Sequence, residues 1–177
     1  MEGLRFQKCN EKTTLKDKNK FDCGHSLLNN YLKDNFLKNI KNGSYGGGII
    51  IDETKEDKVV AFFSVSGMHL IFDDYTYLKN AADQKLPKKI PILKLWMIAV
   101  DKSYQSQGIG KFLMREVFLM SIRISSESGC IAVCLDAAEH SIPFYESLGF
   151  LKLQEEKNED GSLPMFILTG TLKASLK

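Results

Sequence analysis

The residues from 105 to 110 could bind phosphate through their backbone. They are Gln105, Ser106, Gln107, Gly108, Ile109 and Gly110, and they join an apolar stretch at 92–100 to a helical pattern that starts at Lys111. The N–H groups at a helix N-terminus point towards one place, and the helix dipole adds positive charge there. Glycines at 108 and 110 let a phosphate approach the backbone closely. This pattern predicts a pyrophosphate site, with an ordinary strand-to-helix turn as the alternative.

Two common nucleotide fingerprints and a metal site are not indicated. The loop matches neither Gly-x-Gly-x-x-Gly nor Gly-x-x-x-x-Gly-Lys-Ser/Thr. No Cys-x-x-Cys occurs, and His25, His69 and His140 lack the spacing of metal ligands. We therefore expect no metal, and we expect the four cysteines to be free thiols that are mostly buried.

Hydrophobic periodicity places the loop in an α/β domain with a mixed sheet. The apolar run 92–100 predicts a buried central strand, and the helix after the loop has an apolar face and ends before Gly129. A β-hairpin is predicted at 49–66, and a helix at 26–37 with Ser26 as its N-cap. The remaining expected elements are strands at 5–9, 130–135, 150–153 and 165–168, a short helix at 141–148, and a long unassigned connection at 73–91.

Length and composition fit one domain. The chain has 177 residues, of which 44% are hydrophobic and 26% charged, so a continuous core is expected. No apolar run approaches the roughly 18 residues needed to span a bilayer, and the first residues lack an apolar signal region. We therefore expect a cytoplasmic protein with no membrane partner. A net charge of +2 argues neither for nor against nucleic acid as a partner.

Two segments together resemble the GNAT acetyltransferases, a family of acetyl-CoA-dependent N-acetyltransferases. Segment 99–113 resembles the family's strand, its Gln/Arg-x-x-Gly-x-Gly/Ala loop and the helix that follows. Segment 135–150, with Phe144 and Tyr145, resembles its second motif. The resemblance covers most of the chain and implies a single GNAT domain over 1–177. The implied fold is an α+β sandwich with a mixed, mostly antiparallel central sheet, flanking helices and splayed central strands.

The resemblance also implies a cofactor site and a catalytic acid. Acetyl-CoA would lie between the strand that ends at Val100 and the strand at 130–135. Backbone groups at Ile98, Ala99 and Val100 would bind the pantetheine arm and polarise the thioester carbonyl. The pyrophosphate would be held by Gln105, Ser106, Gln107, Gly108, Ile109, Gly110 and Lys111. The hydroxyl of Tyr145 would protonate the departing thiolate, and the acceptor amine would attack directly. The alternative for Tyr145 is that it only packs beneath the cofactor.

The general base stays open between several groups. The candidates are water and the side chains of Asp136, Glu139, His140 and His69, because a base must first lie within reach of the amine. Many family members have Asn where this chain has Ala138, so a side-chain contact to the cofactor is not expected there.

The N-terminal region resembles a bacterial branch of the family. Phe21, Asp22, Cys23 and Gly24, followed by 27–32, are similar to the opening of a branch that includes toxins acetylating aminoacyl-tRNA, which pair with a DNA-binding antitoxin. Those toxins are usually basic and carry an arginine just before the Leu-Ala-Val-Asp stretch of the central strand. Here the corresponding neighbourhood, from Lys94 to Asp101, has no arginine, and the net charge is +2. The sequence alone therefore leaves the amine acceptor unspecified, with a tRNA-acetylating toxin as an alternative. A non-catalytic acyl-CoA-binding module is the alternative of another class, and a homodimer is a further expectation from the family.

Overall fold

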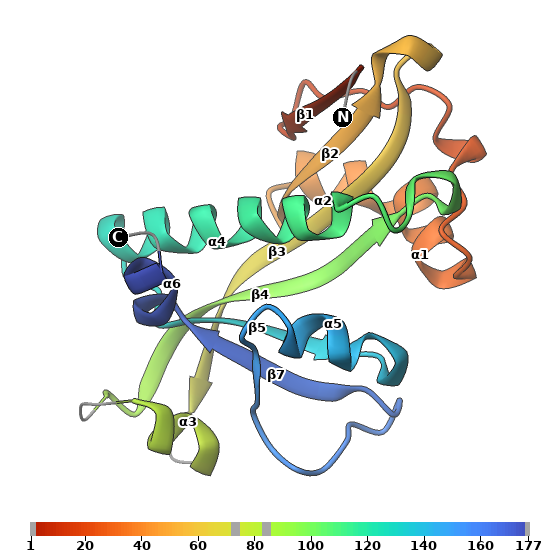
Figure 1. Ribbon diagram of the computed structural model, residues 1–177. Helices are drawn as coiled ribbons and strands as arrows, with labels where there is room; N and C mark the ends of the chain where they lie inside the picture. The colour runs from red at the N-terminus through yellow and green to blue at the C-terminus, as the bar shows by residue number, and fades with distance from the viewer. Residues whose placement is uncertain (1–2, 72–74, 83–85, 176–177) are drawn as a thin grey trace. The chain divides into compact units, whose positions relative to one another are not determined.

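The computed structural model describes residues 3–71, 75–82 and 86–175, and its hydrogen bonds order seven strands as β1-β2-β3-β4-β5-β7-β6 (Figure 1). The β4–β5 pair is parallel, and the β1–β2, β2–β3, β5–β7 and β6–β7 pairs are antiparallel, as expected for a mixed sheet. The strands are β1 (Leu4–Lys8), β2 (Gly46–Asp52), β3 (Lys58–Ile71), β4 (Lys89–Val100), β5 (Ala132–Ala137), β6 (Leu151–Lys152) and β7 (Leu163–Leu168).

The chain divides into two compact units. The first unit contains residues 1–66 and 96–116, and the second contains 67–95 and 117–177. Strands β3 and β4 and the long helix α4 (Ile109–Glu127) each contribute residues to both units. The phosphate loop belongs to the first unit, and Tyr145 belongs to the second.

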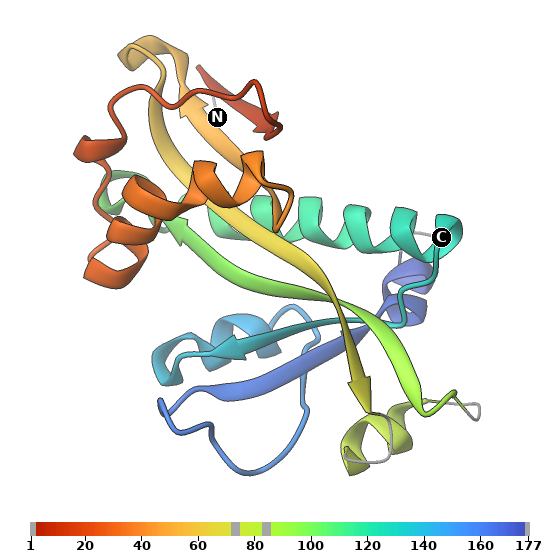
Figure 2. The ribbon, with the colours of Figure 1, turned by 180° about the vertical axis from the view of Figure 1, so that it is seen from behind.

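In the first unit, helices cover β2 and β3 on one side, which is the side seen in Figure 2. The helical segment is α1 (Ser26–Asn30), a π-helical turn η2 (Tyr31–Phe36) and α2 (Leu37–Lys41). Phe36 packs edge-on against Phe62 of β3, with ring centroids 5.4 Å apart, and Tyr31 stacks on the same Phe62 at 6.0 Å. This aromatic contact anchors the helices to the sheet.

The opposite side of β3 is also covered. Phe63, which follows Phe62 and therefore points to the other face, stacks on Phe6 at 6.4 Å, and Phe6 contacts Phe112 of α4 at 5.8 Å. Burial on both faces explains why β3 reads as a continuous apolar run rather than as an alternating strand.

Two glycines in β2 allow these aromatic layers to form. A Cβ on Gly47 would lie 2.5 Å from the carbonyl oxygen of Phe63 and 3.2 Å from the ring of Phe36. A Cβ on Gly48 would lie 2.6 Å from Phe6. Both glycines therefore lie among the aromatic side chains that form the core of the first unit.

The second unit has its own core. Antiparallel β5 and β7 are paired from Ala132 with Leu168 to Ala137 with Leu163. Parallel pairing joins Ile92 to Ala132 and continues to Leu95 with Leu135. The second unit also contains helices α3 (Thr76–Ala81), α5 (Ile142–Glu146) and α6 (Thr169–Ser175) and the later part of α4. One cluster of buried residues in its core consists of Leu78, Ile90, Ile92, Ala132, Cys134, Leu153 and Phe166.

Several local expectations need correction. Ser26 is the first residue of α1, and the N-cap is His25, whose carbonyl accepts a hydrogen bond from the N–H of Asn29 at 3.0 Å. Strand β3 continues to Ile71, five residues beyond the expected end at Ser66. The connection 73–91 contains α3 and the start of β4, although 73–74 and 83–85 lie outside the described residues. Helix α6 was not expected.

Candidate functional site

The predicted phosphate loop joins the end of β4 to the N-terminus of α4. A 3₁₀ turn, Lys102–Tyr104, follows β4, and an exposed segment at 105–108 leads into the helix. The carbonyl of Gly108 accepts the N–H of Phe112 at 3.0 Å, so the amides of Ile109, Gly110 and Lys111 form the first helical turn. N–H groups in a first turn have no acceptor within the helix and are free for an anion.

Gly108 has a backbone conformation that suits this role. Its φ is +82°, in the region that favours glycine, and no heavy atom would lie within 4 Å of an added Cβ. Ser106 also has a positive φ, of 61°. The loop is therefore open and exposed, as a backbone cradle for a pyrophosphate should be.

The predicted cofactor residues have different exposures. Ala99 is buried in the core of the first unit, while Ile98 and Val100, which alternate with it, are half-buried. The side chain of Ile109 is 1% exposed, so only its backbone could reach a ligand. Gln105, Ser106, Gln107, Gly108 and Lys111 are exposed, and Gly110 is half-buried.

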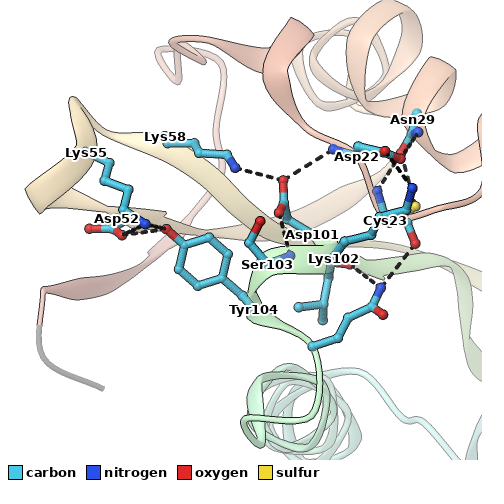
Figure 3. A network of polar contacts seen from close by, with 12 residues as sticks. Asp22, Cys23, Asn29, Asp52, Lys55, Lys58, Asp101, Lys102, Ser103 and Tyr104 are labelled. Atoms are coloured by element: carbon cyan, nitrogen blue, oxygen red, sulfur yellow. Dashed lines mark hydrogen bonds and ion pairs between the residues drawn. The ribbon is translucent and has the colours of Figure 1, made fainter.

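Asp101 holds the start of the loop in place. Its Oδ1 accepts from the N–H of Ser103 at 3.0 Å, and its Oδ2 lies 3.0 Å from Nζ of Lys58 (Figure 3). The N–H of Asp22 also donates to Oδ2, at 3.3 Å. Burial alone would raise the pKa of Asp101, but the Lys58 ammonium and the two backbone donors outweigh it and lower the pKa. The carboxylate is therefore a charged, buried anchor.

Tyr104 fixes the 3₁₀ turn on the β2–β3 hairpin. Its buried hydroxyl donates to Oδ2 of Asp52 at 2.6 Å and accepts from Nζ of Lys55 at 3.0 Å. The ammonium of Lys55 also lies 5.0 Å from the centre of the ring. These contacts connect the loop to the hairpin.

Gln105 connects the loop to β4 and to the N-terminal turn. Its Nε2 donates to the carbonyl oxygen of Val100 at 2.9 Å and to that of Cys23 at 3.1 Å. The side-chain amide of Gln105, a predicted cofactor residue, therefore donates its hydrogen bonds to backbone carbonyls of the protein itself. Asp22, Lys58 and Asn29, which also belong to this network, were not identified as site residues from the sequence. The signal that could have found one of them is the Asp22-x-Gly24 spacing, because Oδ1 of Asp22 accepts the N–H of Gly24 at 2.8 Å in an Asx turn.

Tyr145 lies on α5 in the second unit. It is 7% exposed, and its ring packs edge-on against Phe144 and Phe150 at centroid distances of 5.2 and 5.6 Å. Burial raises the pKa of the phenol to about 12. The hydroxyl is therefore protonated at physiological pH, which a proton donor requires.

The candidate bases also lie in the second unit, on its surface. Asp136 is ion-paired with Lys94 at 2.6 Å, and Glu139 is paired with Lys157 at 3.1 Å. His69 and His140 are exposed. The structure favours none of these four as the base.

The thiols of the described residues are free, and most of them are buried. Cys9, Cys130 and Cys134 are buried and Cys23 is half-buried, all as free thiols. Burial raises the pKa of Cys9 and of Cys134 to about 12, so both are unreactive at neutral pH. Among the residues that the structure describes, no three His, Cys, Asp or Glu side chains are grouped to hold a metal ion. Within the same part of the chain, no helix has the length and apolar character to cross a bilayer.

Comparison with known protein families assigns the chain to one of them. Residues 49–152 match the acetyltransferase (GNAT) domain, which spans β2 to β6 and includes the loop and Tyr145. This match covers more than half of the chain, and the chain therefore belongs to the GNAT family. It is an acetyl-CoA-dependent acetyltransferase, as the resemblance implied.

Individual relatives differ in how much of the chain they match. The glucosamine 6-phosphate N-acetyltransferase of Trypanosoma brucei brucei is 45% identical over 53 residues, which are 30% of this chain and 33% of that protein. The chain thus matches only a third of that relative's length. The tRNA-acetylating toxin of Mycobacterium tuberculosis (strain ATCC 25618 / H37Rv) is 23% identical over 76% of this chain and 78% of the toxin.

Solved structures with the same fold match nearly the whole chain. A bacterial toxin superimposes with a TM-score of 0.90 at 22% identity, over 98% of this chain and 94% of the toxin. The toxin AtaT in complex with acetyl-methionyl-tRNAfMet gives 0.84 at 23% identity, over 98% and 99%. AtaTR with bound acetyl-CoA gives 0.83 at 24% identity, over all of both chains. These likenesses confirm the GNAT fold.

Proposed function

We propose that the chain transfers the acetyl group of acetyl-CoA to the amino group of an aminoacyl-tRNA and acts as a toxin. The observation that carries the proposal is the extent of the likeness. The family model begins at residue 49, whereas the toxin structures match 98% of the chain or more and so include the helical segment α1-η2-α2. The N-terminal segment lies outside the residues that the family model matches, so its likeness to the toxins is additional to family membership and supports the same acceptor.

In this proposal the backbone supplies most of the cofactor contacts. Groups of Ile98, Ala99 and Val100 bind the pantetheine arm, and one N–H polarises the thioester carbonyl. The carbonyl of Val100 already accepts from Gln105, but a carbonyl oxygen has two lone pairs and can accept a second donor. The segment 105–111 holds the pyrophosphate at the start of α4. The amine attacks the positioned thioester directly.

Tyr145 is the proposed proton donor to the departing thiolate. Its pKa of about 12 is above the ordinary value of a thiol, about 8.5, which alone would disfavour the transfer. However, burial raises the pKa of a thiol as well, and in this protein it raises that of Cys134 to about 12. A thiolate leaving into similarly dry surroundings would match the phenol.

A test uses the live cell and the purified protein together. Induced expression in a bacterium should arrest growth, and Tyr145→Phe should relieve the arrest at an equal level of protein. The purified chain should move labelled acetyl from acetyl-CoA to charged tRNA and not to deacylated tRNA. Normal growth together with unlabelled charged tRNA would reject the toxin function.

A small primary amine is the second candidate acceptor. It is favoured by the charge pairing in the first unit, where Lys16, Lys20, Lys58 and Lys102 each lie within 3.0 Å of a carboxylate oxygen. Paired lysines contribute less to binding a polyanion. Release of the CoA thiol with a small amine, in an assay of a panel of amines, would support this candidate. Acetyl-CoA binding without transfer to any amine or tRNA would instead indicate a non-catalytic module.

A further inference from the structure

We infer that Asp22 is a positioning residue for the phosphate loop, and that Asn29 fixes Asp22 on helix α1. This inference rests on the proposed function, because it assigns a role relative to the pyrophosphate held by the loop. Neither side chain belongs to the family's loop motif, and both lie more than 70 positions before it in the sequence.

The turn at 21–24 is bound to the loop through both backbone and side chains. The N–H of Lys102 donates to the carbonyl of Asp22 at 2.8 Å, and Nζ of Lys102 lies 2.9 Å from Oδ2 of Asp22. The N–H of Asp22 donates to Asp101, and the carbonyl of Cys23 accepts from Gln105. The turn therefore contacts Asp101 and Lys102, which lead into the phosphate loop (Figure 3), and also Gln105, the first residue of the loop.

The same turn is bound to α1. Nδ2 of Asn29 donates to Oδ1 of Asp22 at 2.9 Å, and Oδ1 of Asn29 accepts the N–H of Cys23 at 2.9 Å and its Sγ at 3.1 Å. Both the nitrogen and the oxygen of the Asn29 carboxamide thus form hydrogen bonds with the turn. Gly24 contributes as well, because it has a φ of +89° and its Cβ position lies 3.1 Å from Cε of Lys102. The turn is a rigid bridge from α1 to the loop.

The charge of Asp22 allows an experiment to distinguish positioning of the loop from a simple Coulomb effect on acetyl-CoA binding. Lys102 holds the pKa of the Asp22 carboxyl well below its ordinary value, aided by Asn29 and Gly24, so Asp22 is an anion near a site for phosphates. Removing that charge should tighten acetyl-CoA binding if only Coulomb forces matter, since it frees Lys102 and removes a repulsion. It should weaken binding if Asp22 positions the loop. The direction of the change therefore decides between the two.

The experiment measures the Kd of acetyl-CoA by calorimetry for Asp22→Asn, Asn29→Ala and Lys16→Met. We expect Kd to rise about threefold to tenfold in the first two, which corresponds to the net value of one hydrogen bond. Lys16→Met is the matched control, because it breaks a 2.7 Å ion pair with Asp57 in the same unit without touching the loop. Its Kd should equal that of the wild type.

Two further measurements distinguish a general loss of structure, an incorrect phosphate site and an incorrect role for Asp22. Acetyl-pantetheine, which lacks the pyrophosphate, should bind the Asp22→Asn and wild-type proteins equally, whereas a general loss of structure would weaken both ligands. Gly108→Ala tests the loop itself, and unchanged acetyl-CoA affinity there would reject the phosphate site of the proposed function. If Gly108→Ala binds acetyl-CoA more weakly than the wild type, while Asp22→Asn binds it as tightly as the wild type or more tightly, only the role of Asp22 is overturned.

Discussion

The side-chain amide of Gln105 donates to the carbonyl oxygen of Val100 at 2.9 Å, and this contact closes the loop onto the strand that precedes it. The proposed pantetheine site at Val100 and the proposed pyrophosphate site at 105–111 are thereby linked by one side chain. Since the same amide reaches Cys23, the spacing between the two subsites is fixed from both the strand and the N-terminal turn.

Gln105→Glu should weaken acetyl-CoA binding about tenfold or more. A carboxylate cannot donate to the carbonyls of Val100 and Cys23, and it places a negative charge beside the phosphates. Calorimetry measures the change in Kd. Gln154→Glu is a suitable control, since Nε2 of Gln154 also donates to a backbone carbonyl, that of Glu156, at 2.9 Å. Equal effects of the two substitutions would contradict a specific role for Gln105.

Tyr145→Phe should lower kcat about a hundredfold or more, the range expected when a general acid is removed, and leave acetyl-CoA affinity nearly unchanged. The phenyl ring keeps the edge-on contacts with Phe144 and Phe150. Stopped-time acetylation assays give kcat, and calorimetry gives Kd. Phe144→Leu controls for disturbed packing without loss of a hydroxyl. An unchanged kcat in Tyr145→Phe would remove the acid from the mechanism.

The pKa of Tyr145 predicts how stability depends on alkaline pH. An ordinary tyrosine ionises near pH 10.0, but burial raises the pKa of Tyr145 to about 12. Because the folded state favours the neutral phenol, this contribution to stability is fully present below pH 10 and is lost as the pH rises towards 12. Urea unfolding between pH 8 and about 11 should show wild type losing stability relative to Tyr145→Phe. Parallel pH profiles for the two proteins would show that the phenol is not buried.

Gly47→Ala should destabilise the protein by about 1–3 kcal/mol, the usual cost of overpacking. Its Cβ would lie 2.5 Å from the backbone oxygen of Phe63, so β2 would have to move away from β3. Gly46→Ala is the matched control, because there the nearest atom is Cγ2 of Val65 at 3.7 Å, an ordinary contact. Urea unfolding compares the two. A similar stability for both variants would contradict the packing described for β2.

The parts of the site that could be predicted from the sequence are those encoded locally. The central strand, the glycine loop and the helix after it follow one another directly between Lys89 and Glu127. Apolar periodicity and the glycines of the loop identify each of them in the sequence. The burial of Tyr145 and the φ of Gly108 agree with the roles predicted for them, although the roles themselves stay predictions.

The remaining features depend on contacts between distant parts of the chain. Asp22 contacts Asp101 and Lys102, which follow it by 79 and 80 positions, and no local pattern in the sequence encodes a contact between residues so far apart. The π-helical turn at Tyr31–Phe36 belongs to the segment that places Tyr31 and Phe36 on Phe62, which is again a tertiary contact. The short helix α6 has a weak local signal, and contacts with β5 and β7 accompany it.

The most direct test of the account is transfer of labelled acetyl from acetyl-CoA to a pool of charged tRNA by the purified chain. We predict label that is sensitive to RNase, absent with deacylated tRNA, and strongly reduced with Tyr145→Phe. Label that appears only on small amines would agree with acetyltransferase activity but would reject aminoacyl-tRNA as the acceptor. The absence of transfer to tRNA and to every amine, despite binding of acetyl-CoA, would contradict the proposed catalytic site.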